Sequence, residues 1–413
     1  MPISVDREKK LPAGWRRVRL EEVCNIVGGT TPDTGKSDYW NGDIVWITPI
    51  DLGKNSEVTI SSSGRRITID GMRSCGIDIL PVDTVIMSSR APIGYISVAG
   101  VPFCTNQGCK SFIPSPSINS LFLYWALKRA VSDIQSLGSG ATFSEVSKSS
   151  LQKFEIPLPP LPEQQRIAAI LNEQMAVVDK ARAAAQERIA AIKALPAAYL
   201  RQVYPKLGQP LPAAWRWVRL GEVIQEAQTG FACGKREANG VIQLRMNNVD
   251  TLGNFIWEEV LRVPKNIKNI ENYFLKPDDV LFNNTNSTDL VGKSALFIGY
   301  IEPVVYSNHF TRLRVVNDRL FPYFLVRWLN HQWQSGVFVA ICNRWIGQSA
   351  VKSDKLLKLV IPLPSLSEQR RISEHFEAQM ATADKTRKAA EEELKTINTL
   401  PAALLRRAFQ GEL

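Results

Sequence analysis

The sequence has few of the residues that build metal centres, disulfide frameworks and hydrolytic sites. Its 413 residues include six cysteines and three histidines, all dispersed and with no CxxC pair, which argues against a zinc site, a disulfide framework and a Ser-His-Asp grouping. No apolar run approaches the roughly 18 residues of a membrane span. The N-terminal stretch MPISVDREKKLPAGW lacks the apolar segment of a signal peptide. We therefore expect a soluble intracellular protein without a metal ion.

Motifs for nucleotide hydrolysis and DNA modification are missing as well. GGTTPDTGKS (28–37) resembles a phosphate-binding loop, but Thr30 stands where the Walker motif requires its first glycine. Pro159-Pro160 lies in a linker and forms no Asn/Asp-Pro-Pro-aromatic methyltransferase loop. Pro277-Asp278 has no Glu-x-Lys within reach to complete a nuclease site. The sequence thus predicts a chain with no catalytic residues and no bound cofactor.

What the sequence does contain is an internal duplication. LPAGWRRVRLEEV (11–23) returns as LPAAWRWVRLGEV (211–223), and residues 156–204 return as residues 361–409 with about half of the positions identical. The stretches between the repeats show little mutual identity; we call residues 24–155 the first module and residues 224–360 the second module. A repeated frame with two diverged modules indicates two different recognition surfaces.

Each longer repeat predicts a helix bounded by prolines. The IPLPPLP segment cannot be helical, because proline lacks an N–H and biases the preceding residue to extended geometry. Pro162 suits the first helical turn with Glu163 complementing the dipole, and Ser367 is the N-cap candidate in the second copy. Pro196 and Pro401 are expected to stop or kink the helices. Each run of roughly 33 residues would span about 50 Å.

A 3-4 spacing of residues within both helices indicates a heptad seam. The seam positions are, in the first helix, Ile167, Leu171, Gln174, Val178, Ala181, Ala185, Arg188, Ile192 and Leu195, and in the second, Ile372, Phe376, Gln379, Ala383, Thr386, Ala390, Glu393, Ile397 and Leu400. Helices of this length, with a seam that is small or polar in its middle, are too weakly apolar to be stable alone. We therefore expect the two helices to pair with each other. The alternative is that each helix packs on its own module.

Both modules contain short β-branched and aromatic runs broken by Gly, Pro, Asn and Asp, and helical spacing at 119–135 and 322–335. These patterns predict an α+β fold: two pseudo-symmetric β-rich domains separated by two long helices that pair with each other. The expected boundaries are 1–155 and 205–360 for the β-rich domains, and 156–204 and 361–413 for the helical spacers.

The net charge of +10 suits a polyanionic partner. The first module, however, holds 11 Lys/Arg and 11 Asp/Glu, and the second 16 and 12, so charge permits nucleic-acid binding without proving it. Arg, Asn and Gln contact base edges and Ser, Thr and Lys contact phosphates, although the same residue types also stabilise turns. The DNA-binding candidates are Thr30, Thr31, Lys36, Trp46, Thr48, Ser88, Ser89, Arg90, Tyr95, Asn106, Gln107 and Lys110 in the first module, and Lys235, Arg236, Arg245, Asn247, Asn248, Asn283, Asn284, Asn286, Lys293, Asn308, Arg344 and Gln348 in the second.

Segments along nearly the whole chain resemble the specificity subunits of type I restriction-modification systems. The matching segments are YWNGDIVWITPIDL (39–52), SSRAPIGYISVA (88–99), TNQGCKSFIP (105–114), LGSGATFSEVSKSSLQKFEIPLPPLPEQQRIA (137–168), LKPDDVLFNNTNS (275–287), VGKSALF (291–297), GQSAVKSDKLLKLVIPLPSLSEQRRI (347–372) and LLRRAFQGEL (404–413). The proline–helix blocks are the most specific of these. By this resemblance, GGTTPDTGKSDYW is the first loop of a target recognition domain.

The resemblance implies that each β-rich domain is a target recognition domain, which contacts one half of a split site in double-stranded DNA, and that the helices form an antiparallel coiled coil. It also implies that the helices dock two modification (methyltransferase) subunits, which two restriction (translocase-nuclease) subunits join. S-adenosylmethionine, ATP and Mg²⁺ are then expected on those partners, in the cytoplasm of a bacterium or archaeon. Base-contacting residues vary within the family, so the resemblance assigns none. The alternatives are a fused methyltransferase–nuclease and a coiled-coil scaffold that binds no DNA.

Overall fold

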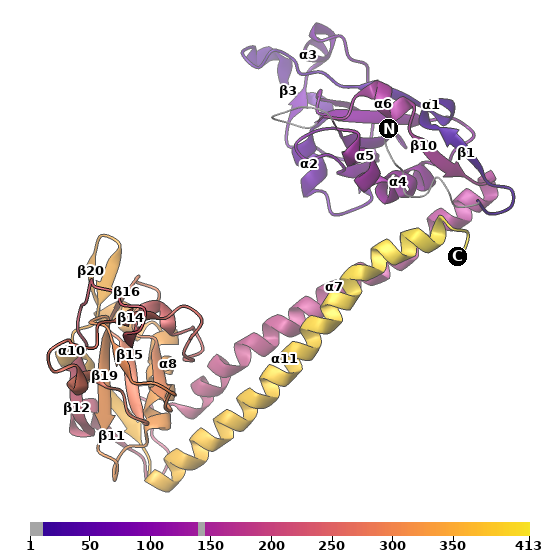
Figure 1. Cartoon of the computed structure of the whole chain (residues 1–413). Coiled ribbons are helices and arrows are strands. Elements are labelled where there is room, and N and C mark those ends of the chain that lie inside the picture. The colour runs from indigo at the N-terminus through magenta and orange to yellow at the C-terminus, as the bar shows by residue number, and fades with distance from the viewer. Residues whose placement is uncertain (1–10, 139–144) are drawn as a thin grey trace. The chain divides into compact units, whose positions relative to one another are not determined.

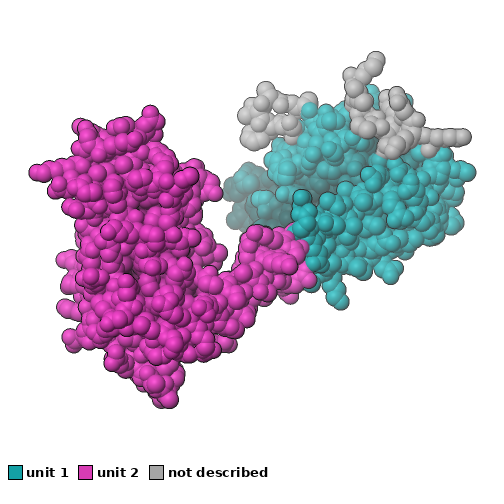
Figure 2. Space-filling view, turned by 60° about the horizontal axis from the view of Figure 1, so that its bottom comes forward, with its two compact units in different colours: residues 1–186, 392–413 teal, residues 187–391 magenta. Residues whose placement is uncertain are grey.

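The computed structural model describes residues 11–138 and 145–413 of the chain. Residues 1–10 of the stretch searched for a signal peptide, and residues 139–144 of the segment 137–168, lie outside the described residues. The chain divides into two compact units (Figure 2): the first is residues 1–186 with 392–413, and the second is residues 187–391. Within the described ranges, no helix has the length and apolar character needed to cross a bilayer.

Each unit closes its β-rich module with a two-stranded antiparallel ribbon. In the first unit β1 (Arg16–Arg19) pairs with β10 (Glu155–Leu158), and in the second β11 (Arg216–Arg219) pairs with β22 (Val360–Leu363). The two ribbons have the same register, so residues at equivalent positions of the two repeats form equivalent pairs. The ribbon therefore joins the strand that precedes each module to the strand that follows it.

The two modules share most of their strand order despite their low sequence identity, and Figure 1 shows strands of both. The first module adds β4 to its larger sheet, and the second has a further sheet of β16 (Thr285–Asn286), β21 (Gln348–Ala350) and β20 (Asn343–Trp345). A larger sheet has the order β2-β9-β6-β7-β4 in the first module and β12-β19-β15-β17 in the second, and a smaller sheet has the orders β5-β3-β8 and β14-β13-β18. Neighbours are antiparallel except in the pairs β3–β8, β13–β18 and β4–β7. The predicted α+β modules with mainly antiparallel sheets are confirmed. The strand bounds are β2 Cys24–Gly28, β3 Trp40–Ile47, β4 Thr59–Ile60, β5 Arg66–Ile67, β6 Val85–Ser88, β7 Ile96–Ala99, β8 Phe103–Thr105, β9 Cys109–Pro114, β12 Ile224–Thr229, β13 Val241–Leu244, β14 Leu261–Val263, β15 Asp279–Asn283, β17 Ser294–Phe297, β18 Val304–Tyr306 and β19 Phe310–Val315.

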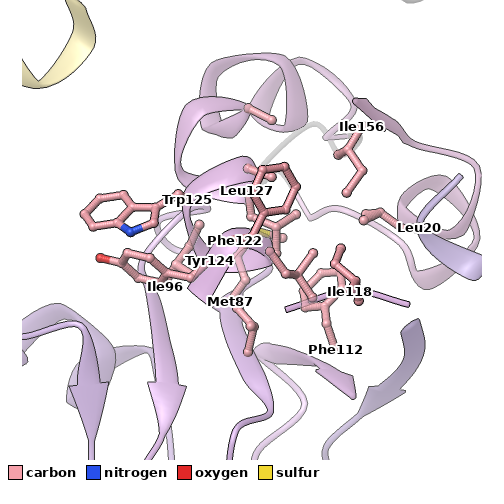
Figure 3. Close-up of a cluster of buried hydrophobic side chains, with 14 of the residues drawn as sticks. Leu20, Met87, Ile96, Phe112, Ile118, Phe122, Tyr124, Trp125, Leu127 and Ile156 are labelled. Carbon is pink, nitrogen blue, oxygen red and sulfur yellow. The ribbon is translucent and has the colours of Figure 1, made fainter. Parts of the chain in front are cut away.

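One amphipathic helix covers the larger sheet of each module. In the first module α4 (Ser120–Arg129) is capped by Asn119, whose side chain accepts a hydrogen bond from the Phe122 amide at 3.0 Å. Its Phe122, Tyr124, Trp125 and Leu127 pack with Met87, Ile96 and Phe112 of the sheet (Figure 3). In the second module α8 (Pro322–Gln334) begins at a proline and buries Phe324, Leu325 and Trp328. Full burial of such side chains contributes about 1.5–3 kcal/mol each, so these helices stabilise the faces of the sheets that they cover.

The two long helices, α7 (Leu161–Val203) and α11 (Leu366–Ala408), pair in antiparallel fashion. In the first unit Val178 and Ala185 pack on Ile397, and Arg182 donates a 2.9 Å hydrogen bond to Asn398. In the second unit Lys193 lies 3.9 Å from Glu391, and the Tyr199 and Phe376 rings are 5.5 Å apart. As residue numbers rise along α7, the numbers of the contacting residues in α11 fall, which confirms the antiparallel pair. Both helices also enter the module cores, so the alternative packing occurs together with the pairing.

Of the two expectations for Pro196 and Pro401, that they stop the helices is wrong, since α7 continues to Val203 and α11 to Ala408; that they kink the helices stays a prediction. The last turns bury Leu200 and Leu405 in the cores of the two units, and this burial offsets the roughly 3 kcal/mol that an internal proline costs. The helix start also differs from expectation. The cap of α11 is Ser365, whose hydroxyl accepts from the Glu368 amide at 3.4 Å, rather than Ser367.

The seam is buried over much of its length but slips out of the predicted register in places. Gln379 is exposed while its neighbour Met380 is partly buried, and Arg188 is exposed while Ile189 is buried. A straight α-helix has 3.6 residues per turn and drifts against a strict heptad, so the buried stripe shifts by one position. Of the other positions, Ile167, Leu171, Val178, Ala185, Ile372, Phe376, Ala390 and Ile397 are buried, Gln174, Ala181, Ile192 and Ala383 are partly buried, and Leu195, Thr386, Glu393 and Leu400 are exposed.

A buried glutamine joins each long helix to its module. The Gln164 side chain accepts a hydrogen bond from the Asn119 amide at 2.8 Å and donates to the carbonyls of Ser117 at 3.1 Å and Pro159 at 2.9 Å. Gln369, its repeat partner, makes the equivalent bonds to the Phe321 amide, the Arg319 carbonyl and the Pro364 carbonyl at 2.8, 3.0 and 3.0 Å. Each amide therefore fixes the helix start, the proline segment and the start of the sheet-covering helix in one orientation.

An ionic network crosses the larger sheet of the second module. The buried Arg312 donates to Glu226 at 2.6 Å, and Arg314 contacts both Glu226 at 3.1 Å and the buried Asp279 at 2.7 Å. Burial alone would raise the pKa of Glu226, but the hydrogen bonds and charges of Arg312 and Arg314 lower it overall. These two arginines are therefore committed to holding strands β12, β19 and β15 together.

We expect Gln164→Ala to destabilise the first unit by about 1–3 kcal/mol, because it leaves buried backbone groups without hydrogen-bond partners. Chemical denaturation followed by circular dichroism measures the change. The matched control is Gln165→Ala, at an exposed neighbouring position, which should alter stability little. Equal stability of the two variants would show that the buried amide does not hold the joint.

Glu226 should make the stability of the second unit depend on pH. Its lowered pKa means that its contribution is present above its ordinary pKa of 4.5 and is lost as the pH falls through the lower folded value. We expect Glu226→Gln to cost about 1 kcal/mol near neutral pH, a figure discounted for the side chain's partial exposure, and less in acid. Chemical denaturation curves near neutral pH and in acid measure this loss of stability. Glu258→Gln, at an exposed position, is the control, and a cost that stays constant with pH would contradict the assignment.

Candidate nucleic-acid interface

A cluster of polar side chains forms in the first module around Lys110 on β9. The Lys110 ammonium donates to the Ser89 hydroxyl at 3.2 Å and the Gln107 carbonyl at 3.4 Å, and lies 3.4 Å from the Glu145 carboxylate. Arg90 lies 4.0 Å from the same carboxylate. The fold thus brings together Ser89, Arg90, Gln107 and Lys110, which the sequence singled out, and adds Glu145, which it did not.

The neighbouring loops approach this cluster closely. A Cβ at Gly108 would lie 2.9 Å from Pro49 and 3.3 Å from the Arg90 Nε, so only glycine lets Arg90 and the start of α2 (Pro49–Lys54) come together. Asn106 accepts a 3.0 Å hydrogen bond from the Gly108 amide. The other candidates of this surface are Thr31, hydrogen-bonded to the Gln107 side chain, Thr48, bonded to Asp51 at 2.5 Å, and Tyr95, 39% exposed and against Gly53.

Four first-module candidates are buried: Lys110 of the cluster above, and Ser88, Ser89 and Trp46, which hold loops in place. Ser88 donates to the Pro92 carbonyl at 2.7 Å and accepts from the Tyr95 amide at 2.9 Å. Contact of these four side chains with DNA stays a prediction; in this structure they lie inside the module. Thr30 and Lys36 are exposed, and Lys36 lies 3.3 Å from the Tyr39 hydroxyl, away from the Lys110 cluster's hydrogen bonds.

Sequence reasoning missed Arg65, which lies over two tryptophans. Its guanidinium carbon is 3.5 Å from the centre of the Trp40 ring and 5.7 Å from that of Trp46. The next residue, Arg66, donates weakly to the Asp43 carbonyl at 3.4 Å. The two adjacent arginines in SSSGRR were the available signal, but the stacking depends on residues distant in sequence.

In the second module, three asparagines form a turn rather than a free surface. Asn283 donates to the His309 carbonyl at 2.9 Å, Asn284 to the Thr311 hydroxyl at 3.0 Å, and Asn286 to the Asn283 side chain at 2.6 Å. All three are buried, as are Asn248, which binds the carbonyls of Ile256 and Glu259, and Lys293, which binds the Val249 carbonyl. Contact of these five with DNA stays a prediction; in this structure their polar atoms satisfy buried polar groups of the module.

The remaining second-module candidates reach solvent. Asn247, Asn308, Lys235 and Arg236 are exposed, and Arg245 is partly buried near His309, whose pKa is lowered by burial and by that arginine. Arg344 and Gln348 lie on the hairpin of β20 (Asn343–Trp345) and β21 (Gln348–Ala350), beside β16 (Thr285–Asn286). At the hairpin tip Trp345 is 59% exposed and Ile346 is fully exposed.

These surfaces suit binding rather than chemistry. Across residues 11–138 and 145–413, no group of three His, Cys, Asp or Glu is placed to hold a metal ion. The exposed Arg, Lys, Asn and Gln side chains are hydrogen-bond donors of the kind that contact phosphates and base edges. Each module thus presents its own donor surface on a shared frame.

Comparison with known proteins supports this interpretation. The model of the type I restriction modification DNA specificity domain family matches residues 12–189 and again residues 212–396, which are the two copies of the duplication. The chain is 34% identical over 240 residues to the type I restriction enzyme MjaIX specificity subunit of Methanocaldococcus jannaschii, a match that covers 55% of each protein. It is 25% identical over 431 residues to the StySPI specificity subunit of Salmonella potsdam, covering 98% of this chain and 90% of the relative.

Two solved structures share the fold. The HsdS subunit from Thermoanaerobacter tengcongensis superimposes with a TM-score of 0.66 at 22% identity, over 99% of this chain and 100% of that chain. A chain from a structure on complex assembly and conformational transition of the type I R-M system gives a TM-score of 0.75 at 23% identity, over 98% and 100%. Two β-rich domains with paired long helices are therefore a known arrangement.

Proposed function

The chain belongs to the family of type I restriction-modification DNA specificity subunits, and from this premise we propose that its two modules each recognise one half of a bipartite, non-palindromic site in double-stranded DNA. As a specificity subunit it is the DNA-targeting part of a type I restriction enzyme complex and is itself non-catalytic. The observation that carries the proposal is the contrast between an identical frame and two different surfaces.

The frame is the same in both units down to single hydrogen bonds. The ribbons share one register, and Gln164 and Gln369 bind equivalent backbone groups. The surfaces differ: the first module offers Arg90, Gln107 and Lys110 around Glu145, whereas the second offers Arg344 and Gln348 on a hairpin. Two unlike surfaces on like frames favour two unlike half-sites.

We assign recognition of the half-sites to residues 1–155 and 205–360, and the spacer to residues 156–204 and 361–413. A helix of 43 residues is about 65 Å long at 1.5 Å per residue. This length is sufficient to bridge half-sites whose centres lie about 34 Å apart, one turn of DNA. The unread gap of the site then follows from the helices and not from the modules.

The partners and location complete the proposal. Two modification subunits, with S-adenosylmethionine, dock on the paired helices, and two restriction subunits, with ATP and Mg²⁺, join them in the cytoplasm of a bacterium or archaeon. The family resemblance supports these assignments. Incubating the purified chain with labelled S-adenosylmethionine separates this proposal from a fused methyltransferase–nuclease, and a gel shift with random-site selection separates it from a scaffold that binds no DNA.

Arg90→Ala should change recognition of one half-site and Arg344→Ala that of the other. A bidentate base contact contributes roughly 1–3 kcal/mol of discrimination, whereas loss of a phosphate contact weakens all sequences alike and reduces the salt slope by about one. Binding-site selection on each mutant complex, scored separately for the halves, measures the effect. Assembly with the modification subunits should persist in both. If Arg90→Ala altered both halves equally, two independent modules would be untenable.

Matched heptad insertions, after Ala184 in α7 and after Thr396 in α11, should lengthen the gap and preserve both half-sites. Seven residues add about 10 Å of helix, equivalent to about three base pairs at 3.4 Å each. An insertion in α7 alone should instead disrupt the pairing. Site selection gives the gap length directly. If the gap length stayed the same after the matched insertions, the helices would not determine it.

A further inference from the structure

Arg65 is held on a rigid aromatic platform in the first module. The indole N–H of Trp40 donates to the Asp33 carbonyl at 3.1 Å, and that of Trp46 to the Thr30 carbonyl at 3.2 Å. The two rings meet edge to face, 5.1 Å apart at 80°, and both are buried. The rings therefore cannot turn, and the 3.5 Å contact with Trp40 fixes the position of the guanidinium above them.

The loop that carries Arg65 is fastened as well. The Ser63 hydroxyl donates to the Arg65 carbonyl at 2.6 Å and accepts from the Trp46 amide at 3.0 Å. The Gly64 amide donates to the Asp51 carboxylate at 2.8 Å, and the other oxygen of that carboxylate binds Thr48. The backbone and the side chain of Arg65 are thus both constrained, next to Thr48 at the start of α2.

The N–H donors of the Arg65 guanidinium have no hydrogen-bond acceptor within residues 11–138 and 145–413. Among the described residues, its guanidinium makes cation–π contacts but no hydrogen bond or ion pair. Arg90 and Lys110, in contrast, share the Glu145 carboxylate, and Arg66 contacts the Asp43 carbonyl. A guanidinium stacked on an aromatic ring keeps its in-plane N–H groups available at its edge. Arg65 therefore combines a fixed orientation with free donors.

We propose that Arg65 is a base-recognising residue of the first module and donates to O6 and N7 of one guanine in the major groove. This inference rests on the proposed function. Arginine can bind a phosphate bidentately as well, so the fork alone does not select a base. The fixed orientation of Arg65 meets the geometric demand of bidentate contact with O6 and N7 of guanine. The module has equal numbers of acidic and basic residues, which favours individually placed contacts over a general attraction to phosphate.

The test is binding-site selection with the complex of this chain and its modification subunits, for wild type, Arg65→Ala, Arg65→Lys and the control Arg66→Ala. We expect both Arg65 variants to lose preference for guanine at one position of one half-site by about 5- to 150-fold, with the other half-site unchanged. Arg66→Ala should leave every base preference intact. Lysine should fail to rescue because it keeps the charge but lacks the fork.

Three outcomes would overturn the inference. Unchanged preferences in both Arg65 variants would exclude a base contact. Uniformly weaker binding in Arg65→Ala, restored by lysine, would identify a phosphate contact. Loss of assembly with intact base preferences would place Arg65 at a protein interface. If instead the wild-type complex selected no bipartite site, the proposed function itself would be wrong, so the two failures are distinct.

Discussion

The buried amide at the start of each long helix is the interaction on which the arrangement of both units depends. One planar group accepts from one backbone amide and donates to two carbonyls, so it fixes three segments at once. Each of these hydrogen bonds joins the glutamine side chain to a backbone group, so none of them uses a side chain of the module. The joint therefore tolerates any module sequence that keeps the backbone path, which explains how the frame stays constant while the modules diverge.

The same separation of roles operates within the modules. Their sheets share most of one strand order, which depends on burial along short strands more than on particular side chains. The polar residues that hold the loops, such as Ser88 and Asn283, are buried, and the donors that face solvent, such as Gln107 and Gln348, contribute little to the core. Residues of the second kind can change without loss of the fold. Specificity can thus vary at little cost in stability.

The sequence predicted the features that repeat and failed where tertiary contacts decide. The duplication, the long helices and their pairing follow from periodicity and internal identity, and the antiparallel direction follows from the family resemblance. Helix ends did not, because burial of Leu200 and Leu405 outweighs a local proline signal. Asparagines in loops could not be divided into turn-forming and exposed residues before the fold was known, since both uses need the same amide. Arg65 escaped notice because its orientation depends on Trp40 and Trp46.

The division of the chain has a consequence for the order in which the molecule is completed during synthesis. The second unit is one continuous segment, 187–391, whereas the first needs residues 392–413, whose Leu405, Ala408 and Phe409 belong to its core. Chains emerge at roughly 5–20 residues per second. Phe122, which packs on Phe409, must therefore wait on the order of 15–60 seconds for its partner. The module made first is the last to be finished, and its exposed apolar face needs protection from aggregation in the meantime.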